Sequence, residues 1–177
     1  MADFWLDTDS LVRPHREFYR FVTVPKFWEF LEQKAKEGVI ASSQFVLEEL
    51  EKGKPRKAKP HESKPDKDKP DKLLTWAKSQ QGVLFQAPTD SVQEVYAQIA
   101  ESVEGNSKYA KHWVQGFLAG ADPWIIAHAK ALGGRVVTFE KPPEPNSKRV
   151  KIPDVAAQFG VDCISLWDML GELNASI

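Results

Sequence analysis

Acidic residues recur along this chain where secondary-structure elements are expected to begin or end. Asp7 and Asp9 follow an apolar run that begins at Phe4. Side chains two residues apart in an extended segment point the same way, so Asp7 and Asp9 are expected to face one site. Two carboxylates in one place repel each other, and a bound cation relieves that repulsion. The alternative interpretation is that both acids cap a turn.

Further acids occupy comparable positions: Glu49, Asp122, Glu140 and Asp154. Each also has a simpler explanation as a helix cap, a partner of the helix dipole, an exposed acid or a member of an ion pair with a nearby lysine. No matching set of His and Cys suggests a zinc site. Oxygen ligands are typical of hard cations, so the sequence predicts Mg²⁺ or Mn²⁺ as the cofactor. Such an ion supports hydrolysis at phosphorus.

The elements that would position these acids alternate between short apolar strands and amphipathic helices. This alternation predicts a three-layer α/β/α sandwich with a mostly parallel sheet of about five strands. In such sheets, ligands bind beyond the carboxyl ends of the strands. The polar segment around Pro14 is expected to be a loop. Strands are expected at 3–8, 39–41, 83–85, 135–140 and 161–166, and helices at 25–38, 42–50, 71–78, 91–103, 107–118, 122–134, 152–160 and around 167–170.

Length and composition indicate one domain over residues 1–177, with an insert at about 52–72. The insert holds nine Lys and Arg against four Asp and Glu, with prolines at 55, 60, 65 and 70 and no large apolar residue. We expect it to be an extended loop, either simply solvated or in contact with nucleic-acid phosphates. No signal-like segment or apolar run of membrane-spanning length is present, so a cytoplasmic protein without membrane contact is expected.

Several short motifs lie at 6–11, 42–50, 122–129 and 136–140, followed by 151–155 and 161–166. Their order resembles that of PIN domains. The resemblance covers nearly the whole chain apart from the insert, and its later part resembles a PIN-like branch found in prokaryotes. It implies a metal-dependent endoribonuclease that hydrolyses RNA, often the toxin of a toxin–antitoxin pair. It also implies a small antitoxin protein and a homodimer as partners.

Carried over by position, the resemblance implies a set of acids at the site. Asp7, Glu49 and Asp122 match the first three family acids, with Glu49 preferred to Glu48 because it directly precedes a leucine. Glu140 stands where the fourth acid is usually Asp. We expect metal ligands among Asp7, Asp122, Glu140 and Asp154.

Other positions receive supporting roles from the same resemblance. Asp9 stands where the family commonly has Asn or Ser, while Thr8 and Thr138 would supply hydroxyls that hold the acids. Glu49 would position, or accept a proton from, the attacking water. Lys141, Lys148 and Arg149 are expected to contact the RNA backbone.

Two other functions remain open at this point. The chain could be a degenerate PIN-like module that binds RNA or a protein without cutting. Alternatively, Asp7-Thr8-Asp9 resembles the opening motif of haloacid-dehalogenase-type phosphatases, in which Asp7 would be the nucleophile and Asp9 the acid/base. A covalent phosphoaspartate would distinguish that chemistry.

Overall fold

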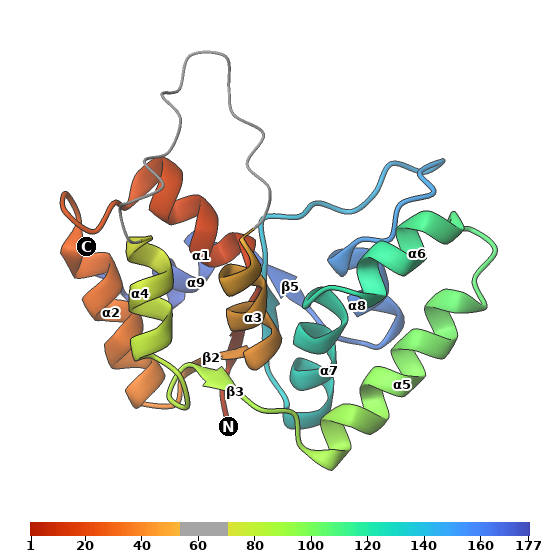
Figure 1. Ribbon diagram of the computed structural model, residues 1–177, viewed down its shortest axis with the longest axis horizontal. Helices are drawn as coiled ribbons and strands as arrows, with labels where there is room; N and C mark the ends of the chain where they lie inside the picture. The colour runs from red at the N-terminus through yellow and green to blue at the C-terminus, as the bar shows by residue number, and fades with distance from the viewer. Residues whose placement is uncertain (54–70) are drawn as a thin grey trace.

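A computed structural model describes residues 1–53 and 71–177 and has an α/β fold around one parallel sheet (Figure 1). The sheet has five strands in the order β3-β2-β1-β4-β5, and every neighbouring pair is parallel. The predicted fold class is therefore confirmed. The strands are β1 (Phe4–Leu6), β2 (Ile40–Ser43), β3 (Phe85–Gln86), β4 (Arg135–Val137) and β5 (Cys163–Ile164).

Helices lie on both sides of this sheet, with α2 and α4 on the left and α5 and α7 on the right in Figure 1. Four of the helices begin at a residue whose side chain accepts a hydrogen bond from the first turn: Ser43, Asp71, Thr89 and Ser165 cap α3, α4, α5 and α9. The helices are α1 (Asp9–Arg13), the π-helix η1 (Pro14–Phe18), α2 (Pro25–Lys36), α3 (Gln44–Lys52), α4 (Lys72–Ser79), α5 (Asp90–Glu104), α6 (Lys111–Leu118), α7 (Asp122–Leu132), α8 (Ile152–Gln158) and α9 (Leu166–Glu172).

The central strand β1 is buried along its whole length, as expected for a parallel sheet with both faces covered. Helix α7 packs against β1, β2 and β4, while α2 packs against β2. From β1 the chain proceeds to β2 and β3, which lie toward one edge of the sheet, whereas β4 and β5 lie between β1 and the opposite edge. The strand order therefore reverses between β1 and β4, and a crevice beyond their carboxyl ends is the usual ligand site of such sheets.

The segment around Pro14 differs from the prediction, because it is helical rather than a loop. Proline has no N–H to donate to the carbonyl four residues earlier, so α1 cannot continue unchanged through Pro14. The next turn is wider: the N–H of Tyr19 donates to the carbonyl of Pro14, five residues back. This turn places Phe18 at the end of η1.

The remaining differences concern boundaries. Every predicted strand has a counterpart, but β1, β3, β4 and β5 are shorter than expected, and α6 begins at Lys111 rather than near 107. The predicted basic insert falls mainly on residues 54–70, which lie outside the described residues. Within the part of the chain that is described, no helix is both long and apolar enough to cross a membrane.

Candidate functional site

Asp7 is the buried acid at the centre of the carboxyl edge. It directly follows β1 and is only 3% exposed. The N–H of Ser10 donates to its Oδ1 (2.7 Å), and the hydroxyl of Thr138, which follows β4, donates to its Oδ2 (2.6 Å). The first bond closes the turn that leads into α1, as the turn-cap alternative predicted for Asp7. The second connects the two strands between which the sheet order reverses.

The environment of Asp7 favours its protonated form. Burial, with a small contribution from the nearby charge of Asp9, raises the pKa of Asp7 to about 6, although hydrogen bonds from Ser10 and Thr138 act in the opposite direction. An acid so perturbed at a sheet edge is a candidate for function. A cation beside it would favour the ionised form.

Glu49 lies on α3 and connects two other parts of the edge. The hydroxyl of Thr8 donates to its Oε2 (2.5 Å), and the N–H of Ala121 donates to its Oε1 (2.9 Å). Glu49 thereby satisfies a backbone donor at the start of α7. Each carboxylate oxygen has a second lone pair, so Glu49 can still accept a hydrogen bond from a water molecule while it holds these two donors.

Asp122 and Asp9 both occupy helical positions that differ from the expectation. Ala121, not Asp122, is the N-cap of α7, and Asp122 is the first helical residue. The backbone already turns helical at Thr8 (φ −61°, ψ −42°), and Asp9 begins α1. The prediction that Asp7 and Asp9 point the same way from an extended segment is therefore wrong. Asp9 is nevertheless close enough to influence the pKa of Asp7.

Glu140 lies two residues beyond Thr138, and the two are connected. The N–H of Glu140 donates to the hydroxyl oxygen of Thr138 (3.0 Å). Its carboxylate accepts from the N–H of Ile152 (2.8 Å) in the first turn of α8. Asp7, Thr138 and Glu140 thus form one continuous hydrogen-bonded chain along the edge.

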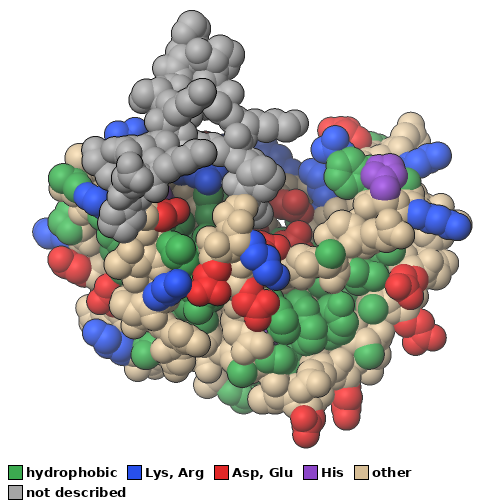
Figure 2. Space-filling view, in the orientation of Figure 1, with side chains coloured by type: hydrophobic (Ala, Val, Ile, Leu, Met, Phe, Trp, Pro, Cys, Tyr) green, Lys and Arg blue, Asp and Glu red, His purple; other side chains and the backbone are tan. Residues whose placement is uncertain are grey.

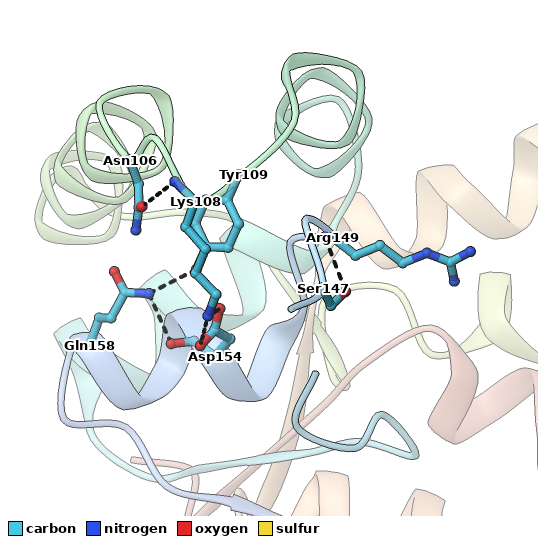
Figure 3. Close-up of polar contacts among 7 residues, drawn as sticks. All are labelled: Asn106, Lys108, Tyr109, Ser147, Arg149, Asp154 and Gln158. Carbon is cyan, nitrogen blue, oxygen red and sulfur yellow. Dashed lines mark hydrogen bonds and ion pairs between the residues drawn. The ribbon is translucent and has the colours of Figure 1, made fainter. Parts of the chain in front are cut away.

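Asp154 belongs to a different cluster, shown in Figure 3. It forms an ion pair with Lys108 (2.8 Å) and accepts a hydrogen bond from the hydroxyl of Tyr109 (2.6 Å), which in turn accepts from Gln158 (2.9 Å). Partial burial alone would raise the pKa of Asp154, but the bonds from Lys108 and Tyr109 outweigh it and lower that pKa. Burial and the contact with Asp154 raise the pKa of Tyr109 to about 12, so this phenol is not activated. The cluster holds α8 against the segment before α6 rather than joining Asp7.

The three predicted backbone-contacting cations are also separated. Lys141 lines a cavity together with Glu140. The carbonyl of Lys148 accepts from Ala110, and the guanidinium of Arg149 lies over the ring of Trp113, 4.6 Å from its centroid. In Figure 3 Arg149 extends away from Asp154. Of the three, Lys141 is the one beside the carboxyl edge.

The acids are connected by intermediate donors rather than gathered into one ligand set. Among residues 1–53 and 71–177, no three His, Cys, Asp or Glu side chains stand together as a group that could hold a metal ion. Figure 2 shows Asp and Glu side chains in a hollow between the two halves of the molecule, with Lys and Arg at its rim. The oxygen donors match a hard cation in chemical type, and the carboxylate oxygens of Glu140 keep lone pairs beyond the one used by Ile152.

Two residues at this edge were missed by sequence reasoning. Ser10 holds Asp7 through its N–H and donates its hydroxyl to the carbonyl of Val137 (2.8 Å). Its spacing of three residues after Asp7 is a typical capping pattern and could have indicated this role. Gly120 makes room for Glu49, since a Cβ at position 120 would stand 3.0 Å from Oε1. Only the fold reveals that second requirement.

Comparison with known proteins identifies the chain by family but not by activity. Residues 4–177 match the family described as Domain of unknown function (DUF4411). The chain belongs to this family. No curated protein and no solved structure matches it. Any function for this DUF4411 chain must therefore be argued from its own residues.

Proposed function

We propose that the protein is a metal-dependent endoribonuclease of the PIN-like kind. The observation that carries this proposal is the position of Asp7, a buried carboxylate at the carboxyl end of the central strand, where the sheet order reverses. Thr138 binds it from the adjacent strand end, and Glu49 and Glu140 lie on the same hydrogen-bonded edge. The motif order that resembles PIN domains supports the same residues.

Carboxylate oxygens of Asp7 and Asp122, with Glu140, would hold Mg²⁺ or Mn²⁺. When bound, such an ion lowers the pKa of water and stabilises charge on a phosphate undergoing displacement. Asp154 is not included, because Lys108 and Tyr109 already engage it.

The remaining residues position water and RNA. Glu49, fixed by Thr8 and Ala121, accepts a hydrogen bond from the attacking water and orients it. Thr138 keeps Asp7 in place. Lys141, at the rim beside Glu140, attracts the RNA backbone.

The test is cleavage of tRNA and structured RNAs by purified protein with Mg²⁺, Mn²⁺ or EDTA. Asp7→Asn should abolish cleavage, whereas Asp154→Asn, its matched control, should retain it. Cleavage that persists in EDTA or in Asp7→Asn would refute the proposal. No stabilisation by Mn²⁺ or Mg²⁺, with no cleavage, would favour a non-cutting module, and phosphate bound covalently to Asp7 would favour the phosphatase.

A toxin role, a small antitoxin and a homodimer are proposed from the resemblance alone, and a cytoplasmic location is proposed from the hydropathy pattern of the sequence. A short reading frame beside the gene, whose product binds the protein and blocks its cleavage of RNA, would support the toxin role. Sedimentation at micromolar concentration would test the dimer.

A further inference from the structure

A cavity of about 630 Å³ adjoins the proposed site, and most of the residues that line it have no role in the proposed chemistry. It extends from Thr138 and Glu140, beyond the end of β4, to the residues after β5 and the start of α9. Its size lies in the range of small-molecule sites. Its lining also includes Arg13 and Phe18, which the unexpected helical segment after β1 carries.

Aromatic rings form much of one wall. Trp167 and Phe18 are 43% and 47% exposed, and their rings meet edge to face with centroids 5.3 Å apart. Phe139 lies next to Trp167 (6.1 Å), and the guanidinium of Arg13 covers the Phe139 ring at 4.9 Å. Large aromatic side chains that remain half exposed in a concave site offer flat faces for a flat ligand.

The charges at this cavity indicate which part of a nucleic acid enters it. Glu140 and Asp168 line the wall and would repel a phosphate, but carboxylates accept hydrogen bonds from the N–H groups of bases. Arg13 and Lys141 supply positive charge, although Arg13 also pairs with Glu17 at 3.1 Å. A base inside the cavity can donate to the carboxylates, while the phosphate attached to it lies near the two cations.

We propose that this cavity binds one unpaired nucleobase of a single-stranded RNA, stacked on the face of Trp167 with Phe18 beside it. This proposal rests on the proposed ribonuclease function, and it specifies single-stranded RNA as the substrate. Because Thr138 and Glu140 line the cavity and also belong to the acidic edge, the base is held next to the phosphate to be cut. A paired base cannot enter, so the site selects unpaired segments.

The test measures the affinity of a fluorescein-labelled 12-nucleotide oligoadenylate RNA by anisotropy, in EDTA at fixed low salt. Without a divalent ion the probe stays intact, and binding is separated from cleavage. Trp167→Ala should weaken binding roughly 5- to 150-fold, the range that loss of one stacking ring gives. Trp167→Phe should retain most of the affinity, and Trp113→Ala, a matched exposed tryptophan on α6, should leave it unchanged.

Other outcomes would overturn the proposal. Equal affinity of wild type and Trp167→Ala, or equal binding of the oligoadenylate–oligouridylate duplex, would exclude a base pocket. A change in oligomeric mass on Trp167→Ala with unchanged RNA affinity would assign the aromatic wall to contact between copies of the chain. Asp7-dependent cleavage with affinity indifferent to Trp167 would leave the nuclease standing without this pocket. RNA binding that depends on Trp167, without any cleavage in Mn²⁺, would support the base pocket and contradict the nuclease.

Discussion

Replacing Asp7 with asparagine should stabilise the metal-free protein at neutral pH. Burial raises the pKa of Asp7 from 3.8 to about 6 in the folded state. Since the folded form holds its proton more tightly than the unfolded form, stability from this group is fully present below about pH 4. It is lost as pH rises through 6. At 1.36 kcal/mol per pKa unit, ionised Asp7 costs about 3 kcal/mol at pH 7.5.

Asparagine removes the charge but keeps only part of the hydrogen bonding. Its Oδ1 can still accept from the N–H of Ser10, whereas its amide faces the hydroxyl of Thr138, which already accepts from Glu140. Straining or losing the hydrogen bond with Thr138 offsets roughly 1–2 kcal/mol of the stability gained by removing the charge. The net expectation for Asp7→Asn at pH 7.5 is therefore a gain of about 1–2 kcal/mol.

Urea denaturation in EDTA between pH 4 and 8 measures this. The difference in unfolding free energy between Asp7→Asn and wild type should grow with pH and level off above pH 6–7. Exposed Asp162→Asn should show no such trend. Saturating Mn²⁺ should stabilise wild type, by about 2.7 kcal/mol at one hundred times its Kd, and leave Asp7→Asn nearly unchanged. A lower unfolding free energy for Asp7→Asn than for wild type, or a difference between them that does not change with pH, would refute the reasoning.

Three further substitutions test the bond between Thr138 and Asp7, the buried imidazole of His128, and the separate ion pair of Asp154. Thr138→Val should destabilise by about 1–2 kcal/mol in urea, because it removes the donor to Asp7 and the acceptor for Glu140; no loss would mean that this connection is weak. His128 is fully buried, and burial lowers its pKa to about 4, so up to about 3 kcal/mol of stability present above pH 6.5 should disappear as pH falls toward 4. His128→Leu should flatten that acid limb, and an unchanged limb would contradict the assignment. Asp154→Asn should lose at most about 1 kcal/mol and keep the full Mn²⁺ response, whereas a lost response would return Asp154 to the site.

The sheet was predictable because parallel strands covered on both faces leave a clear pattern of short apolar runs. Phe4–Leu6 is wholly buried, as its composition indicates. The helical turn after Thr8 was not predictable by the same means, because Pro14 is usually a sign of a break. In the fold, the wider π-turn accommodates the missing donor, and this turn carries Phe18 to the cavity.

The candidate site was predictable in position more than in detail. The order of Asp7, Glu49 and Glu140 along the chain placed them at one edge, since carboxyl ends of parallel strands meet there. Which donors hold each acid depends on contacts between distant segments, such as Thr8 with Glu49. Asp154 stands at a helix start as expected, yet Lys108 and Tyr109 bind it from a segment whose position the sequence does not specify.

The chemical groups at the cut ends of the RNA are the sharpest test of metal-dependent hydrolysis at Asp7. If a metal site at Asp7 directs water at phosphorus, the RNA 2′-hydroxyl takes no part, and the products carry 3′-hydroxyl and 5′-phosphate ends. Mass spectrometry of a single-stranded RNA digested with Mn²⁺ identifies these ends. We expect these ends from the wild type and no products from Asp7→Asn. Ends carrying 2′,3′-cyclic phosphate, or products from Asp7→Asn, would contradict it.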